Sequence, residues 1–166
     1  MDIHKPKSRR RWPEFLKVMA AIVICVPIAL LPPPARADAR ARDVEALMAD
    51  YTRLWSAKDA HAIWTTVYRL DPGQTFHSEA DLAAEFARLR AQGYDHSDLQ
   101  SAKGCLLTPK TALAVLRFSR LKADGTPMPP KDRASLYLLR KFDDGWRITA
   151  LLGLSPSARI DCASAQ

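Results

Sequence analysis

The sequence predicts an α+β domain with helices first and an antiparallel sheet second. Between residues 43 and 91, apolar residues recur every three to four positions, as in amphipathic helices. After Gly93 the period falls to two, which is typical of strands. Short turn sequences, TPK and DDG, separate successive strands and favour an antiparallel meander. We therefore expect three helices packed against one curved sheet.

The first 37 residues have the composition of a secretory signal peptide. A basic segment precedes an apolar run, Val18 to Leu31, and the small residues Ala35 and Ala37 predict cleavage before Asp38. A permanent membrane anchor is the alternative, but the run contains Pro27 and is shorter than the about 20 residues that span a bilayer. We expect a periplasmic or secreted protein that meets the membrane only through this segment. SRRRWPEFLK resembles the twin-arginine export signal, so that route and the general secretory route both stay open.

Cleavage at this site removes most of the net charge of +7. The segment holds seven of the 25 Lys and Arg residues and two of the 18 Asp and Glu residues, which leaves a charge near +2. The mature chain therefore lacks the basic character of a nucleic-acid-binding domain. We expect no nucleic-acid partner.

Each predicted helix shows an apolar stripe and a start or stop signal. The first begins at Asp43 and carries a stripe that includes Tyr51 and Trp55. The second spans Ala60 to Tyr68, with Asp59 as its N-cap. The third starts after Ser78, and Gly93 ends it.

Four strands follow, and the domain is expected to span residues 38–154. The alternation predicts strands at Tyr94 to Leu107, Thr111 to Leu121, Ala134 to Phe142 and Trp146 to Leu154. KADGTPMPPKD is expected to be a longer loop, and residues 155–166 a flexible polar tail. Two cysteines remain in the mature part, Cys105 and Cys162. Export would allow them to form a disulfide, and the alternative is a buried thiol and a free one.

The order of these elements, with the stretches LWSAKDAHAIW and DDGWRITALLG, resembles the nuclear transport factor 2-like (NTF2-like) superfamily, which includes SnoaL-like and ketosteroid isomerase-like proteins. The resemblance covers nearly the whole mature chain. It implies a cone-shaped fold, in which a strongly curved sheet wraps around three helices and leaves a pocket at its wide end. It also implies that two copies often pair through the convex face of the sheet. Because this superfamily contains both enzymes and binding proteins, the resemblance does not determine an activity.

One catalytic role follows from the resemblance. Ketosteroid isomerases place an oxyanion-binding tyrosine eight residues before the Asp that opens the second helix, and Tyr51 has this spacing to Asp59. A neutral phenol in a dry pocket stabilises developing negative charge. The base of that family has no clear counterpart here, so His77 or an acidic residue is the candidate. The alternative role for Tyr51 is that of a core or pocket-lining aromatic residue.

The candidate ligand-binding residues are Trp55, Trp64, Tyr68 and Arg117. The three aromatic residues form either a pocket wall or core filling, because helical spacing alone does not separate the two. Arg117 would suit an anionic ligand if it faced the pocket. The histidines lack ligand spacing, so no metal site is expected.

Three functions remain open at this point. The first is an exported domain that binds a small, largely apolar ligand without a cofactor. The second is a cofactor-free enzyme of the isomerase or dehydratase kind, which uses Tyr51 as its electrophile. Its reaction class would be isomerase or lyase. The third is a structural or interaction module of the cell envelope.

Overall fold

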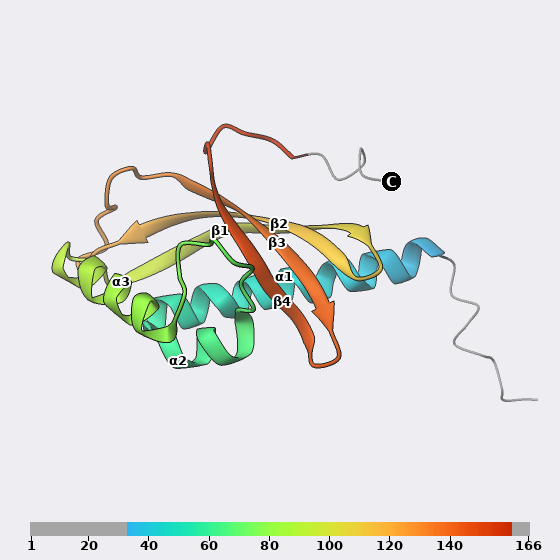
Figure 1. The fold of residues 1–166 in the computed structure, drawn as a ribbon. Coiled ribbons are helices and arrows are strands. Elements are labelled where there is room, and N and C mark those ends of the chain that lie inside the picture. Colours follow the sequence, from blue (N-terminus) through green and yellow to red (C-terminus); the bar gives the residue numbers. More distant parts are fainter. Residues whose placement is uncertain (1–32, 161–166) are drawn as a thin grey trace, which may run out of the picture. The chain divides into compact units, whose positions relative to one another are not determined.

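The computed structural model describes residues 33–160, with side chains from residue 39 onward. The predicted signal peptide, residues 1–37, lies almost entirely outside the described residues, so its cleavage stays a prediction. Among the described helices, none is long and apolar enough to cross a membrane. The described part is α+β, as predicted, with helices on one face of a four-stranded antiparallel sheet (Figure 1).

Helix α1, Pro33–Ala57, starts about ten residues earlier than the predicted Asp43. The added segment is rich in Ala and Arg, which are strong helix formers, and its first residue is a proline, which is favoured at a helix start. The predicted cleavage site after Ala37 falls within this helix. Lys58 ends α1 with a left-handed backbone, φ 58°.

The second predicted helix is shorter and more irregular than expected. Asp59 caps α2, Ala60–Ala62, by accepting a hydrogen bond from the Ala62 amide at 2.9 Å. A π-helical turn, η3 (Ile63–Val67), follows, because the Tyr68 amide bonds to the Ile63 carbonyl five residues back. Tyr68 was predicted to be helical, but it is extended and pairs with Ile148 of the sheet.

Helix α3, Glu79–Ala91, has the predicted cap: the Ser78 hydroxyl accepts from the Asp81 amide at 3.2 Å. Four strands follow, β1 (His96–Thr108), β2 (Thr111–Leu121), β3 (Arg133–Phe142) and β4 (Gly145–Leu154). Their bounds agree with the predicted ones to within about two residues at each end. They pair in the order β1-β2-β3-β4, which confirms the meander.

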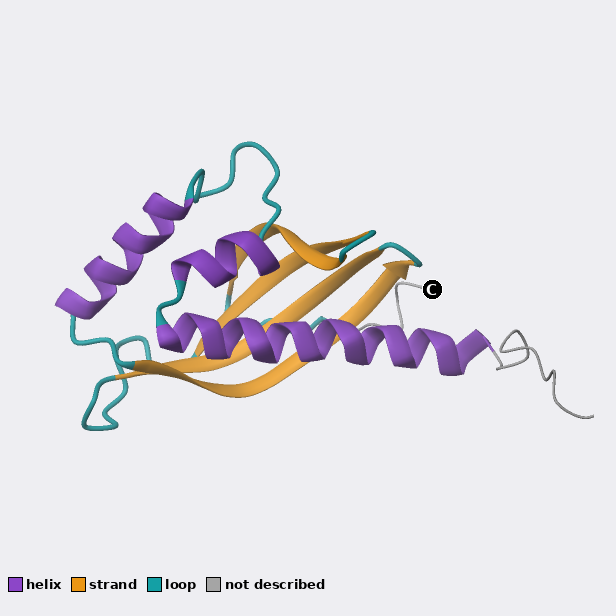
Figure 2. Cartoon of the chain, turned by 90° about the horizontal axis from the view of Figure 1, so that it is seen from below, coloured by secondary structure: helices purple, strands orange, loops and turns teal. Residues whose placement is uncertain are grey.

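The sheet has two faces with different surroundings. The inner face curves around the helices, as Figure 2 shows from below, and the outer face points away from them. On β2, Ala112, Ala114 and Leu116 belong to the core and define the inner face. Gly104 of β1 permits the close approach of α1, since a Cβ there would lie 2.9 Å from the Ala41 carbonyl oxygen.

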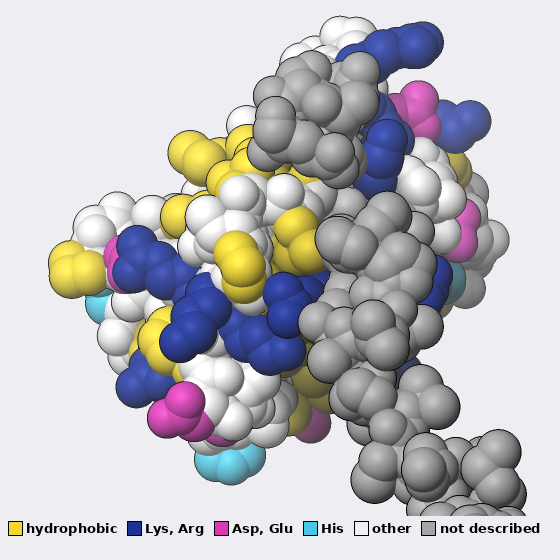
Figure 3. Space-filling view, turned by 90° about the vertical axis from the view of Figure 1, so that its right-hand side faces the viewer, with side chains coloured by type: hydrophobic (Ala, Val, Ile, Leu, Met, Phe, Trp, Pro, Cys, Tyr) yellow, Lys and Arg dark blue, Asp and Glu magenta, His cyan; other side chains and the backbone are white. Residues whose placement is uncertain are grey.

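One end of the sheet is formed by the β1–β2 and β3–β4 turns and is basic. Lys110, Arg140, Lys141 and Arg147 are neighbours there in the strand register and its hydrogen bonds. Figure 3 shows Lys and Arg side chains gathered on this side of the molecule. Asp71 pairs with Arg140 at 3.5 Å, and Asp144 pairs with Arg147 at 3.0 Å. The two arginines of this surface are therefore already neutralised in part.

Candidate functional site

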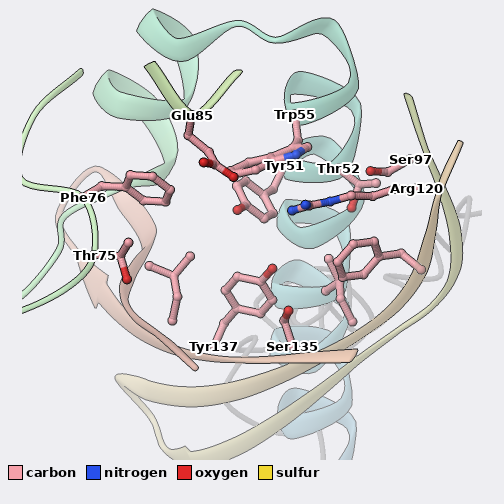
Figure 4. Close-up of a pocket in the computed structure, with 13 residues that line it drawn as sticks. Tyr51, Thr52, Trp55, Thr75, Phe76, Glu85, Ser97, Arg120, Ser135 and Tyr137 are labelled. Carbon is pink, nitrogen blue, oxygen red and sulfur yellow. The ribbon is translucent and has the colours of Figure 1, made fainter. Parts of the chain in front are cut away.

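A cavity of about 210 Å³ lies between α1, α3 and the inner face of the sheet (Figure 4). We call it the central cavity. Its lining combines aromatic and aliphatic walls with a few polar groups, as in ligand pockets. The lining residues are Tyr51, Thr52, Trp55, Thr75, Phe76, Glu85, Ser97, Leu116, Phe118, Arg120, Ser135, Tyr137 and Leu151.

The walls are held rigid by aromatic packing. Trp55 meets Phe86 edge to face, with ring centroids 4.8 Å apart, and also contacts Phe76 at 6.4 Å. Phe86 is 1% exposed and comes from α3, whereas Trp55 comes from α1. This aromatic pair is therefore a contact between the two helices. An aromatic pair of this geometry adds about 0.5–1.5 kcal/mol beyond its burial.

Three tyrosines meet at the floor of the cavity. The Tyr51 and Tyr68 hydroxyls are 2.8 Å apart, and the Tyr51 and Tyr137 rings are in edge contact at 5.5 Å. Burial raises the pKa of all three phenols, and the closeness of the others raises the pKa of Tyr51 further. All three are therefore neutral at ordinary pH. Either hydroxyl of the Tyr51–Tyr68 pair can be the donor in this hydrogen bond.

Arg120 brings a positive charge into the cavity. It lies on the inner face of β2, and its guanidinium extends toward Tyr51 (Figure 4). The guanidinium lies 6.0 Å from the Trp55 ring centroid and 5.9 Å from that of Tyr94. Its Nε atom is buried and has no hydrogen-bond acceptor within residues 33–160.

Glu85 is the acidic side chain that lines the cavity, and its carboxylate points inward (Figure 4). The Arg88 guanidinium donates to both of its oxygens, at 2.7 and 2.6 Å. The Glu85 side chain is 21% exposed. Glu85 and Arg88 therefore form a bidentate ion pair, in which both carboxylate oxygens are used.

Of the six predicted site residues, two line the cavity and four do not. Tyr51 and Trp55 line it, and Tyr68 lies directly behind Tyr51. His77 and Trp64 line a separate surface groove, to which Tyr68 also contributes. His77 is exposed because it immediately precedes the cap of α3, where its backbone amide donates to the Asp81 carboxylate. The predicted meeting of Tyr51 and His77 in one pocket is therefore wrong for this structure.

Arg117 does not face the central cavity either. Since the inner residues of β2 are even-numbered, Arg117 lies on the outer face. There its guanidinium donates to the Pro156 and Ala158 carbonyl oxygens of the segment that follows β4. It lines an outer groove with that segment. The strand register thus corrects the prediction that Arg117 binds a ligand in the cavity.

The structure describes one of the two cysteines that were predicted to form a disulfide. Cys105 is 3% exposed and disulfide-bonded. Cys162 lies outside the described residues, so the predicted pair stays a prediction. Within residues 33–160, no group of three or more His, Cys, Asp or Glu side chains could hold a metal ion.

The sequence analysis missed Arg120, Tyr137 and Glu85. A signal for Glu85 exists, because it occupies the apolar stripe of α3 that Leu82, Phe86 and Leu89 define. A charged residue in such a stripe suggests a pocket. A weaker signal exists for Arg120, because the other even-numbered residues of β2, Ala112 to Phe118, are all apolar, whereas the odd-numbered set also contains Thr111 and Ser119.

Comparisons with known proteins agree with the geometry. The family model described as "NTF2-like protein (DUF6841)" matches residues 65–156. No curated protein matches the chain significantly.

Solved structures share the fold at low sequence identity. An NTF2-like protein with a cystatin-like fold from Novosphingobium aromaticivorans is 23% identical, with a TM-score of 0.53, and the match covers 71% of this chain and 84% of that one. A protein of unknown function from Mycobacterium tuberculosis is 16% identical, with a TM-score of 0.55 and coverages of 81% and 85%. A candidate beta subunit of an aromatic-ring-hydroxylating dioxygenase, also from N. aromaticivorans, is 14% identical, with a TM-score of 0.51 and coverages of 76% and 95%. At these identities the likeness concerns the fold alone. Since the family model spans more than half of the sequence, the chain belongs to the NTF2-like family.

Proposed function

We propose that the chain binds a small molecule with an apolar body in the central cavity. The observation that supports this most directly is the cavity itself, a volume of about 210 Å³ with aromatic walls and a few polar groups. Pockets for drug-sized ligands measure about 300–1,000 Å³, so the ligand of this cavity is expected to be smaller than a drug-sized molecule. The proposal needs no cofactor. It includes the export of the chain, which rests on the sequence of residues 1–37.

Binding is tested by filling the cavity. Ser135 lies on the inner face of β3 and lines the cavity, so Ser135→Phe places a ring inside it. Ser101→Phe makes the same change on the outer face, where Ser101 is exposed opposite Arg117. Thr75→Phe fills the cavity from an exposed loop position and carries little risk to folding.

The measurement is native mass spectrometry of the full-length gene product purified from the producing cell. We expect a bound small molecule in the wild type and in Ser101→Phe, and none in Ser135→Phe or Thr75→Phe. The same masses report whether the chain begins at Asp38. Reduction of the sample tests for the disulfide between Cys105 and Cys162. A wild type without a ligand, or a ligand retained in both filled variants, would contradict binding in the cavity.

A cofactor-free isomerase or dehydratase is the second candidate. The hydrogen-bonded Tyr51–Tyr68 pair at the cavity favours it, because a polarised neutral phenol stabilises an oxyanion. Glu85 would take the place of His77 as the acidic residue that acts as base. If the bound molecule carries a carbonyl group, Tyr51→Phe should slow its conversion without preventing its binding.

Pairing of two copies through the outer face of the sheet is a separate prediction. The outer face carries Leu152, which is 56% exposed, next to partly buried Leu136 and Leu138. Such a surface suits a partner of the same kind. An interaction module of the cell envelope would use this face instead of the cavity.

A further inference from the structure

Arg120 is a cation that has no counter-ion among the described residues, although its site is partly enclosed. No residue in the described part of the chain forms a hydrogen bond or an ion pair with its guanidinium, and its contacts there are with aromatic rings. Its Nε is buried without an acceptor. A buried charged donor without an acceptor is unfavourable, so the fold alone gives no reason for this residue.

A second arginine increases the positive potential. Arg133 lies on the inner face of β3, paired in register with Phe118, and its Nε is also buried without an acceptor. Burial, and then the charge of Arg120, lowers the pKa of Arg133, which places the two cations within electrostatic reach. One Arg133 nitrogen donates to the Pro129 carbonyl at 2.7 Å. Within residues 33–160, Glu85 is the carboxylate that lines the cavity, and Arg88 already holds both of its oxygens.

Neutral hydroxyl donors lie close to Arg120. The Tyr137 hydroxyl points from the inner face of β3 toward the middle of the cavity, and Ser135 is beside it (Figure 4). Arg120 by itself would lower the pKa of Tyr137, but burial has the larger effect and keeps this phenol protonated. A guanidinium and a phenol that point into one space match the two oxygens of a carboxylate.

We propose that the ligand of the central cavity is a small organic carboxylate with an apolar body, and that Arg120 is its charge partner. This rests on the proposed binding function. The carboxylate lies between Arg120 and Tyr137, and the charge of Arg133 adds to the positive potential at this place. The apolar body lies against Phe76, Phe118 and Leu151, which line the same cavity. We expect the ligand to carry one negative charge, because Arg120 is the arginine in the cavity lining of the described chain.

The test compares benzoate with benzamide, a neutral molecule of the same shape, by isothermal titration calorimetry on the full chain. We expect the wild type to bind benzoate about tenfold or more tightly than benzamide, since a charge-assisted pair is involved. Arg120→Gln should remove this preference, and Arg120→Lys should keep part of it. Arg117→Gln, on the outer face three residues away, should leave both affinities unchanged. Circular dichroism verifies that each variant is folded.

Each result separates the two proposals. Equal binding of benzoate and benzamide to the wild type, or a preference that survives Arg120→Gln, overturns the carboxylate and leaves cavity binding intact. Failure of the wild type to bind benzoate also overturns the carboxylate. Failure to bind either probe, together with a purified chain that carries no ligand, overturns the binding function as well.

Discussion

The two faces of β2 each carry an arginine, and the two arginines have opposite surroundings. Arg117 on the outer face donates to two backbone carbonyls and fastens the segment after β4 to the sheet. Arg120 on the inner face has a buried Nε without an acceptor, and it lies among aromatic rings at the central cavity. They are only three positions apart along the strand.

This difference distinguishes a structural residue from a candidate functional one. An arginine whose guanidinium bonds to backbone carbonyls is explained by its role in the fold. An arginine with unused donors beside a cavity is explained by a ligand that binds there. The acids show no such contrast, since Glu85 at the cavity pairs with Arg88 just as Asp71 and Asp144 pair with other arginines. Three predictions sharpen the comparison of the two faces, starting with the largest expected effect.

The first concerns alkaline pH. Tyr51, Tyr68 and Tyr137 lie on the inner side, and burial raises the pKa of each in the folded chain. Their contribution to stability is therefore fully present below their unfolded pKa of about 10 and is lost as the pH rises above it. We expect the free energy of unfolding to fall there by about 1.4 kcal/mol per pH unit for each tyrosine that ionises only on unfolding.

Urea unfolding at a series of pH values measures this decrease, and phenolate absorbance of the folded chain provides the control. If these tyrosines titrated in the folded state near their ordinary pKa, the inner side would be open to water. That result would contradict the enclosed floor of the cavity.

The second compares neighbouring leucines of β3. Leu139 is on the inner face and 0% exposed, whereas Leu138 is on the outer face and partly exposed. Leu139→Ala should reduce the free energy of unfolding by about 2–5 kcal/mol, because it leaves a cavity in the core. Leu138→Ala should cost clearly less in a monomer. Equal costs in urea unfolding would indicate that the outer face is also covered, as expected if two copies pair there.

The third replaces each arginine with methionine. Arg117→Met removes charge-assisted hydrogen bonds to two carbonyls and should cost about 0.5–1.5 kcal/mol. It should also make residues 155–160 more sensitive to protease. Arg120→Met should leave the free energy of unfolding nearly unchanged or raise it, since an apolar side chain replaces a partly desolvated charge. Equal destabilisation by both changes would show that Arg120 is needed for the fold itself.

The sequence predicted the fold closely because its signals are local. Ser78 and Asp59 cap their helices as expected, and the turns TPK and DDG join the strands where they were placed. The predicted bounds were wrong at the start of the first helix and at the end of the second. The early start of α1 follows from helix-forming Ala and Arg residues, and the π-helical turn before Tyr68 follows from pairing with Ile148, which lies far along the chain.

The candidate site was predicted in part. Tyr51 and Trp55 were found because they belong to the apolar stripe of a long helix, whose buried side the sequence marks. His77 was misplaced because the direction of a loop residue depends on its neighbours in space. Arg117 was chosen over Arg120 because a shift of one residue in a strand exchanges its faces.

The sequence by itself determined the order of the helices and strands, the meander and the helix caps, because periodicity and capping act over a few residues. Only the tertiary structure decided which face of β2 turns inward, which arginine keeps unused donors and that Glu85 and Tyr137 line one cavity. These depend on the register of the sheet against α1, which is determined by packing between residues far apart in the chain.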